Sequence, residues 1–329
     1  MKKTQITTIG GGTGSFSTLL GLKKYPVELS AIVTMMDDGG SSGKLRDELG
    51  VLPPGDVRQC IVALAKSSKL LRDLFNYRYL SGGLKGHSFG NIFLSTLEKQ
   101  TGSIKKAINE AGKILSIKGK VIPVTFTKSK LCVQLANNKK IEGEHHIDVS
   151  DNIGKRDRIK KAYLKPNAKL NPEAKKAILH ANYILIGPGD LYTSIIPNLL
   201  VSGTAQSIKK SKAKKIYVMN LMTKYGQTNK YKAQNHIDDL EKYLGIGVVN
   251  TILINNKKPS LKTLEWYKKH NEEPVIDNLD EKKYNVIRAN LIKDLFLNKT
   301  KGDELRRSII RHDPEKLAKK IMQIINVKK

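Results

Sequence analysis

The chain has 329 residues, of which 39% are hydrophobic, and 59 basic against 30 acidic residues give it a net charge of +29. This length allows one large α/β domain or two smaller ones, and the absence of a run of about 18 apolar residues argues against a membrane span. Cys60 and Cys132 lie far apart and predict neither a zinc cluster nor a disulfide framework. Because the first residues read as a strand, we expect no signal peptide and a cytoplasmic protein.

The excess of basic residues is typical of proteins that bind nucleic acid. The lysines are spread in pairs, such as Lys23-Lys24 and Lys319-Lys320, and form no long basic arm. No zinc finger and no RNA-binding aromatic motif accompanies them. We therefore interpret the charge as a solvated surface and expect no nucleic-acid partner, and a binding isotherm with no salt dependence would exclude that alternative.

The first predicted element is a β-branched strand at residues 4–9, and an apolar helix-like run to Leu20 follows a glycine-rich turn. The turn consists of Gly10, Gly11, Gly12, Thr13 and Gly14. Bare backbone N–H groups before a helix N-terminus suit a phosphate. The dinucleotide fingerprint is incomplete because Ser15 holds its last glycine position, and a P-loop would need a lysine. A tight turn without a ligand is the alternative.

A second buried strand, at residues 28–36, ends in Asp37 and Asp38 before a glycine-serine loop. Carboxylates at the carboxyl edge of a sheet are placed to bind a ribose or Mg²⁺, or to cap the loop itself. Asp56 precedes a helix that we expect to begin near Val57, where it would serve as N-cap or as a further metal ligand. Arg58 is unfavourable in a first helical turn, which predicts a phosphate contact.

A helix-like segment at residues 70–79 is followed by a glycine-framed turn that holds His87 and leads through Asn91 into another apolar helix. The repeated design of turn and helix N-terminus suggests that His87 binds a phosphate or hydroxyl, although a lone histidine is often structural. From residue 119 to 166 the pattern alternates like strands, and we expect a β-rich insertion subdomain there. His145, His146 and Asp148 read as part of a polar strand rather than as a metal site.

A third strand, at residues 183–186, ends in Gly187-Pro188-Gly189-Asp190, and a fourth ends at Asn220, shortly before Thr223. Strands that alternate with helices imply right-handed crossovers and a parallel sheet. Their polar ends should then gather in one crevice along one edge. Residues 248–255 are expected to be the last core strand, and the final helix should begin after Arg311.

With these motifs assembled, the chain resembles the YvcK-like gluconeogenesis factor family, a branch of the CofD-like superfamily that includes 2-phospho-L-lactate transferase. The resemblance is carried by Asp-Asp-Gly-Gly-Ser-Ser-Gly, Pro-Pro-Gly-Asp and Gly-Pro-Gly-x-Leu-Tyr-Thr-Ser, with further matching segments along the whole core. It implies one CofD-like domain over residues 1–329, with a Rossmann-like three-layer α/β/α fold, a mostly parallel sheet and the β-rich insertion at 119–166.

The resemblance also implies a function and several site residues. In the transferase branch a Mg²⁺-dependent enzyme moves a lactyl-phosphate group from a guanine nucleotide to a flavin-like acceptor, and aspartates that match Asp38 and Asp56 hold the metal. The gluconeogenesis factor branch looks like a regulator that binds UDP-N-acetylglucosamine and links gluconeogenic growth to cell wall synthesis and cell shape. Residues that match Tyr267 and Arg311 contact that ligand. Asp190 departs from the serine common in relatives, and its role stays open.

Two functions therefore stay open: a UDP-sugar-binding regulator that signals to a protein partner, and a Mg²⁺-dependent transferase with His87 as a base. A nicotinamide-dependent dehydrogenase is disfavoured by the incomplete fingerprint. Mg²⁺ on Asp38 and Asp56 is the expected cofactor, no flavin or haem is expected, and a homo-oligomer is left open. The residues expected to bind the ligand are Gly10, Gly11, Gly12, Thr13, Gly14, Asp37, Asp38, Arg58, His87, Asn91, Gly187, Pro188, Gly189, Asn220, Thr223, Tyr267 and Arg311.

Overall fold

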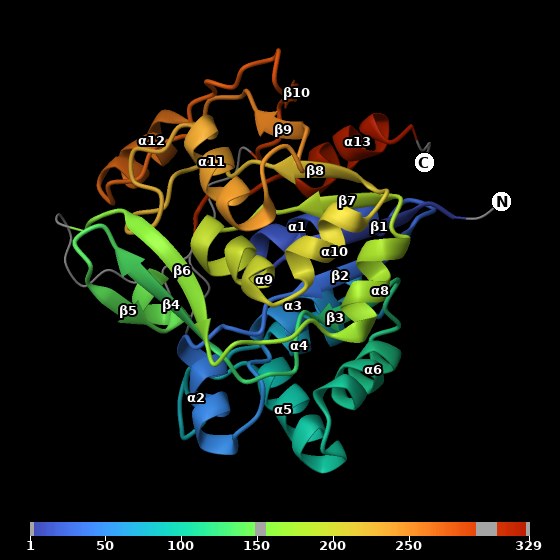
Figure 1. The fold of residues 1–329 in the computed structure, drawn as a ribbon. Helices are drawn as coiled ribbons and strands as arrows, with labels where there is room; N and C mark the ends of the chain where they lie inside the picture. The colour runs from blue at the N-terminus through green and yellow to red at the C-terminus, as the bar shows by residue number, and fades with distance from the viewer. Residues whose placement is uncertain (1–2, 149–155, 294–307, 327–329) are drawn as a thin grey trace.

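A seven-stranded parallel sheet forms the centre of the protein, whose computed structural model describes residues 3–148, 156–293 and 308–326. In this part of the chain the strand order is β10-β9-β8-β7-β1-β2-β3 (Figure 1). The strands are β1 (Gln5–Gly10), β2 (Glu28–Val33), β3 (Lys120–Pro123), β7 (Tyr183–Ile186), β8 (Lys214–Val218), β9 (Thr251–Asn255) and β10 (Asn285–Ala289). The central strands are short apolar runs, as expected for strands that are buried on both faces.

Helices cover both faces of the large sheet and give three layers, which confirms the expected Rossmann-like α/β/α fold (Figure 1). One face packs against α1 (Gly12–Leu22), α3 (Gly55–Leu64), α5 (Phe89–Thr101), α6 (Ile104–Ile114) and α13 (Pro314–Ile324). The other face packs against α8 (Pro172–His180), α9 (Ile196–Leu200), α10 (Thr204–Lys210) and α11 (Ala233–Leu244). The remaining helical elements are α2 (Gly40–Leu49), α4 (Lys69–Asn76), α7 (Glu144–Asp148), α12 (Leu261–Lys268) and the π-helical turn η1 (Leu191–Ile195).

The order of the strands reverses direction beside β1. From β1 the chain continues to β2 and β3 on one side, and it then returns to β7 on the other side before adding β8, β9 and β10. In open α/β sheets, ligands bind at such a switch point, in the crevice outside the carboxyl ends of the strands. The topology therefore directs attention to the turns that follow β1 and β7.

The segment expected to form an insertion at residues 119–166 divides between two sheets. Its first strand, β3, pairs in parallel with β2 and so belongs to the large sheet. A separate antiparallel sheet with the order β5-β4-β6 is formed by β4 (Lys130–Leu135), β5 (Lys140–Glu142) and β6 (Ile159–Lys165). This small sheet lies beside the helical layers at the left of Figure 1.

Two further expectations are corrected by the structure. The residues from Glu144 to Asp148 form the short helix α7, whereas His145, His146 and Asp148 were expected in a polar strand. Residues 251–255 are followed by one more core strand, β10, which pairs with β9 at the edge of the sheet. An edge strand is only partly buried, and β10 lacks the continuous apolar run that marks the central strands.

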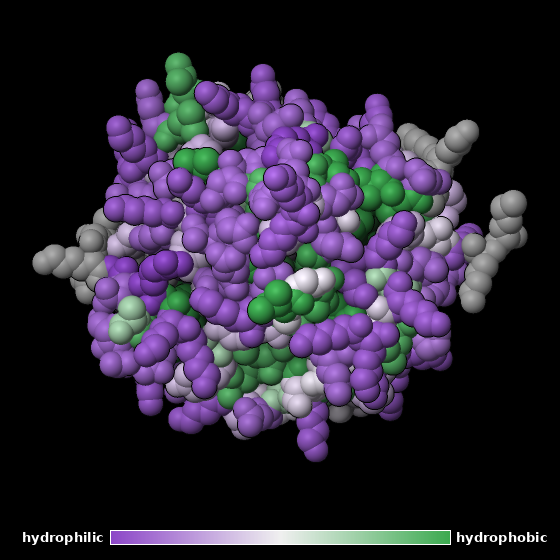
Figure 2. Space-filling model, turned by 45° about the horizontal axis from the view of Figure 1, so that its top comes forward, coloured by the Kyte–Doolittle hydropathy of each residue, from purple (hydrophilic) through white to green (hydrophobic). Residues whose placement is uncertain are grey.

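The surface is dominated by hydrophilic residues, with smaller hydrophobic areas between them (Figure 2). The lysine pairs are distributed over several helices and strands, as they are in the sequence. In the described part of the chain, no helix combines the length and the apolar character that crossing a membrane requires.

Candidate functional site

A cavity of about 200 Å³ opens at the carboxyl ends of the strands, where the turns after β1, β2, β7 and β8 meet. Most of the residues predicted from the sequence line it, which confirms that the strand-end turns share one crevice. Those that line the cavity are Gly11, Gly12, Thr13, Gly14, Asp37, Asp56, Arg58, Asn91, Pro188, Gly189, Asn220, Thr223, Tyr267 and Arg311. Gly10, Asp38, His87 and Gly187 are not among the residues that form its wall.

The turns after β1 and β7 pack directly against each other. A Cβ atom on Gly14 would lie 2.1 Å from the carbonyl oxygen of Pro188, so only a hydrogen atom fits there. Gly12 has a φ of +61°, a left-handed conformation that favours glycine. The N-cap residue of α1, Gly11, offers no side-chain acceptor to the first helical turn. Apart from the Gly12 N–H, which Asp56 binds, the first turn of the helix has backbone N–H groups and a partial positive charge at the cavity.

Asp56 connects α3 to the glycine turn. Helix α3 begins at Gly55, so Asp56 lies inside its first turn, and the expected N-cap position is held by Pro54. Its Oδ1 accepts a hydrogen bond of 2.8 Å from the backbone N–H of Gly12. A Cβ atom on Gly11 would lie 2.1 Å from the Asp56 Oδ2, so a larger residue there would displace the Asp56 carboxylate.

The two neighbouring aspartates after β2 have different surroundings. Asp37 lines the cavity, and its Oδ1 accepts a hydrogen bond of 3.0 Å from the Gly39 N–H. The Asp38 carboxylate accepts a bond of 2.7 Å from the backbone N–H of His145 and lies 3.7 Å from the Arg46 Nη1. Asp38 thus holds the N-terminal end of α7 in place, and its role as a ligand or metal contact stays a prediction.

Arg58 begins a buried chain of hydrogen bonds beside the cavity. Its Nε donates to the Asn91 Oδ1 at 2.9 Å, and the Asn91 Nδ2 donates to the Ser41 hydroxyl at 3.1 Å. The same hydroxyl lies 3.1 Å from the His87 Nδ1. Burial, assisted by the Lys44 ammonium, lowers the pKa of His87 and favours its neutral form. His87 therefore supports Ser41, which lines the cavity, and its action as a base stays a prediction.

Asn220 and Thr223 hold the wall of the cavity at the end of β8. The Asn220 Oδ1 accepts a hydrogen bond of 3.0 Å from the Gly189 N–H and so fixes the turn after β7. The Thr223 hydroxyl accepts a bond of 2.9 Å from the Glu273 N–H. The Asn220 contact shows how a polar side chain at the end of one strand positions the turn that follows its neighbour, and the Thr223 contact ties the end of β8 to the segment after α12.

Tyr267 and Arg311 reach the cavity from the C-terminal third of the chain. The Tyr267 side chain is fully buried, and its hydroxyl accepts a hydrogen bond of 3.3 Å from the Ile310 N–H. Its ring packs edge-on against Trp266, with the ring centroids 5.0 Å apart. Tyr267 therefore positions the segment that carries Arg311, and its stacking on a ligand stays a prediction.

A group of charged residues that the sequence analysis did not assign forms another part of the wall. The Lys224 Nζ lies 3.1 Å from the Asp148 Oδ1. Burial raises the pKa of Asp190 to about 6, with the carboxylates of Asp148 and Glu272 adding to the effect and Lys224 opposing it. Burial would lower the pKa of Lys224, but the three carboxylates together raise it above its ordinary value. The only sequence signal for Asp190 was its place after a strand-end glycine turn.

Glu144 brings a further carboxyl group to the cavity from α7. Burial raises its pKa well above the ordinary value, and the nearby Asp37, Asp148, Asp38 and Asp56 raise it further. Within residues 3–148, 156–293 and 308–326, however, no group of three or more His, Cys, Asp or Glu residues is arranged to hold a metal ion. A cation bound here would need ligands from water or from a phosphate as well.

Comparison with known proteins gives consistent matches over nearly the whole chain. The family model described as 2-phospho-L-lactate transferase CofD matches residues 6–292. The gluconeogenesis factor of Bacillus subtilis is 37% identical over 326 residues, which cover 98% of this chain and 99% of that protein. The gluconeogenesis factor of Halalkalibacterium halodurans is 39% identical over 325 residues, which cover 98% and 97%. A crystal structure of a Bacillus halodurans protein superposes with a TM-score of 0.88 at 38% identity, covering 98% of this chain and 99% of that one.

Proposed function

Because the chain belongs to the CofD family, together with the gluconeogenesis factors, we propose that it is a regulatory protein that binds a UDP-sugar in the cavity at the switch point of the sheet. UDP-N-acetylglucosamine is the expected ligand. In this proposal the protein acts in the cytoplasm and links gluconeogenic growth to cell wall synthesis and cell shape through a protein partner.

The observation that carries the proposal is the contact between the turns after β1 and β7. At Gly14 the contact excludes any side chain, and Gly12 needs its left-handed backbone. A wall of bare backbone beside the N-terminus of α1 suits the diphosphate of a nucleotide sugar, since oriented N–H groups and the helix dipole both favour negative charge.

The charged residues of the wall support a phosphorylated ligand and a role for a cation. Arg58, Arg78, Arg311 and Lys224 line the cavity, and guanidinium groups bind phosphate oxygens in a bidentate manner. Five carboxyl groups face the same space, on Asp37, Asp56, Glu144, Asp148 and Asp190. A diphosphate placed among so many carboxylates is favoured by a bound cation, which offsets their mutual repulsion.

The residues present fit Mg²⁺ best through Asp37 and Asp56, which both line the cavity. Mg²⁺ is ordinarily held by one or two carboxylates, with phosphate oxygens and water completing its coordination. When bound, the ion would neutralise charge on the diphosphate. Asp38 does not line the cavity, and its carboxylate accepts the His145 N–H and lies near Arg46, so we do not place it in this site.

Calorimetric titration with UDP-N-acetylglucosamine, in the presence of MgCl₂ or EDTA, tests the proposal. We expect saturable binding to the intact protein and a loss of affinity of about tenfold or more for Arg311→Ala, because a charge-assisted phosphate contact is worth about 1.5–3 kcal/mol. Arg288→Ala is the matched control, since Arg288 lies on β10, pairs with Asp277 and Glu281, and does not line the cavity. No binding by the intact protein, or equal affinity of both variants, would refute the assignment.

A Mg²⁺-dependent phospho-group transferase is the second candidate. The observation in its favour is Asp190, which lines the cavity and whose pKa burial raises to about 6, so that it can exchange a proton near neutral pH. Prolonged incubation of the ligand with the protein and Mg²⁺, followed by mass spectrometry, separates the two functions. Cleavage that disappears in Asp190→Asn favours the transferase, and an intact ligand favours the regulator.

A further inference from the structure

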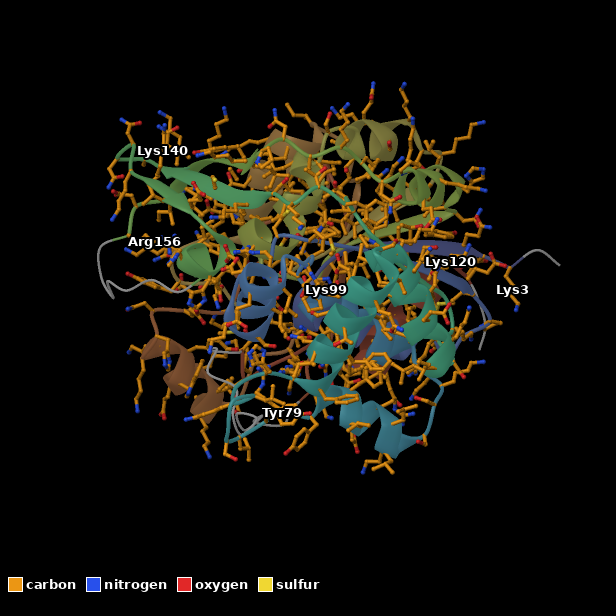
Figure 3. All side chains as sticks on the ribbon, turned by 90° about the horizontal axis from the view of Figure 1, so that it is seen from below. Lys3, Tyr79, Lys99, Lys120, Lys140 and Arg156 are labelled. Atoms are coloured by element: carbon orange, nitrogen blue, oxygen red, sulfur yellow. The ribbon has the colours of Figure 1, made fainter. Side chains whose placement is uncertain are left out.

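The surface feature that the cavity does not explain is an exposed apolar area on α4 and on the loop after it. Its members, here called the α4 patch, and their exposed fractions are Leu70 (80%), Leu74 (41%), Tyr77 (50%), Leu80 (50%) and Leu84 (45%). Leu70 and Leu74 are four residues apart and therefore lie on the same face of the helix. Figure 3 shows the neighbouring Tyr79 on this loop, at the edge of the molecule.

Helix α4 reaches the core through a different face. Phe75 is buried, and its ring packs edge-on against Phe89 and Phe93 of α5, with centroids 5.7 Å and 5.1 Å apart. The face with Leu70 and Leu74 is thus a second apolar side, which the described part of the chain leaves exposed. Exposed leucine and tyrosine side chains on one short segment make it a candidate interaction surface.

The loop after α4 is held in a defined shape. Its two sides are joined by backbone hydrogen bonds from Tyr79 N–H to the His87 carbonyl (3.0 Å) and from Phe89 N–H to the Tyr77 carbonyl (2.9 Å). Leu80 and Leu84 lie at the tip of this hairpin. The patch therefore combines one turn of a helix with the tip of a fixed loop.

Two arginines connect this segment to the cavity. The Arg58 Nη1 donates to the Asn76 Oδ1, at the C-terminal end of α4, and to the Phe75 carbonyl at 3.4 Å. The Arg78 Nη1 donates to the Gly86 carbonyl, at the base of the hairpin. Both arginines line the cavity. An anion that engages either guanidinium competes with bonds that fix the end of α4 and the hairpin.

We propose that the α4 patch is the docking surface for a protein partner that presents apolar side chains rimmed by acidic residues, and that occupancy of the cavity tunes this docking. Apart from Arg78 in the cavity wall, residues 66–85 carry four basic side chains, on Lys66, Lys69, Arg72 and Lys85, against the single acidic Asp73, so an acidic rim is complementary. A second copy of the chain is disfavoured as the partner, because it would bring the same local charge and its own net charge of +29. Exposed leucines offer no stacking surface to nucleic-acid bases, and the rings of Tyr77 and Tyr79 already pack edge-on at 5.2 Å.

Site-specific photo-crosslinking in cells that produce the protein tests the docking. A benzophenone side chain is placed at position 80 and, as a control, at Leu261, which is 79% exposed on α12. We expect an adduct with an acidic protein from position 80 only, and its loss in the double variant Leu70→Asp, Leu74→Asp. Both leucines are exposed, so this variant should keep the melting temperature of the unaltered protein. No adduct, equal adducts at both positions, or adducts with RNA or with a second copy of the chain would overturn the proposal.

The purified partner then tests the connection to the cavity, which is the step that rests on the proposed function. The double variant should bind the partner about tenfold or more weakly, as expected for the loss of hot-spot side chains. UDP-N-acetylglucosamine should change the partner's dissociation constant about fivefold or more, a typical coupling between two sites. Calorimetry on the isolated chain reports ligand binding separately. Partner affinity that stays the same with bound ligand overturns the connection, whereas failure of the ligand to bind at all overturns the proposed function.

Discussion

The contact between Gly14 and Pro188 offers the sharpest test of how the cavity is built. In Gly14→Ala the new Cβ atom would lie 2.1 Å from the Pro188 carbonyl oxygen, 2.6 Å from its carbonyl carbon and 3.1 Å from the Gly189 nitrogen. All three are backbone atoms, so no side-chain rotation relieves the overlap. The turns after β1 and β7 must separate, and the cavity wall between them must change shape.

The expected size of the effect follows from two opposing terms. Alanine inside a helix is favoured over glycine by about 1 kcal/mol. Overpacking against a rigid neighbour costs about 1–3 kcal/mol and occasionally more, and an overlap with backbone carbonyl atoms belongs at the upper end of that range. We therefore expect the free energy of unfolding to fall by about 2 kcal/mol and the affinity for UDP-N-acetylglucosamine to fall by about tenfold or more, since 1.4 kcal/mol of lost contact is tenfold.

Urea denaturation followed by circular dichroism measures the stability of this variant, and calorimetry measures its affinity. Gly112→Ala in α6 is the matched control, because there a Cβ atom meets only the Ile117 side chain, at 3.0 Å from its mobile Cδ1. The control should stay within about 1 kcal/mol of the unaltered protein and bind the ligand normally. If Gly14→Ala behaved like the control in both assays, the close packing of the two turns would be refuted.

Three further substitutions test the core and the site. His236 is fully buried, its ring nitrogens have no hydrogen-bond partner among the described residues, and burial lowers its pKa to about 4. Between pH 6.5 and 4 the unfolded chain therefore binds a proton that the native chain does not, so His236→Phe should remove about 2 kcal/mol of the stability that is lost from pH 7 to pH 5. Tyr267→Phe deletes the acceptor of the Ile310 N–H, which should lower stability by about 1 kcal/mol and weaken ligand binding without unfolding the chain. Asp37→Asn should reduce the effect of Mg²⁺ on ligand affinity more than Asp38→Asn does, because only Asp37 lines the cavity.

Each of these expectations has a direct readout. Urea midpoints are measured at pH 7 and pH 5 for His236→Phe and for the unaltered protein. If both proteins show the same difference between the two pH values, His236 is not the source of this loss of stability. For Tyr267→Phe, a normal melting curve with normal affinity would show that the hydroxyl contributes to neither stability nor ligand binding. Titrations with and without Mg²⁺ compare the two aspartates. A stronger effect of Asp38→Asn would support Asp38 and Asp56, the metal ligands that the sequence predicts.

The sequence predicted the turns of the site better than its charged walls. The turns from Gly11 to Gly14 and at Pro188-Gly189 were recognisable because a strand that ends in glycines is a local pattern. Asp190 followed a recognisable turn but was assigned no role, and Lys224 carried no motif, since their electrostatic interaction depends on how the loops after β7 and β8 approach each other. Likewise, the chain places Asp37 and Asp38 side by side, and only the position of α7 decides that one faces the cavity and the other holds the helix.

The sequence by itself determined the alternation of strands and helices and the gathering of strand ends along one edge, because hydrophobic periodicity and the handedness of crossovers are local properties of the chain. The sequence also determined where glycines leave the backbone without side chains, in the turns after β1 and β7. The tertiary structure decided which side of the sheet each later strand joined, so that the turns after β1 and β7 became neighbours although about 175 residues separate them. It also decided which carboxylates were buried together, since a pKa shift arises from charges and burial contributed by distant segments.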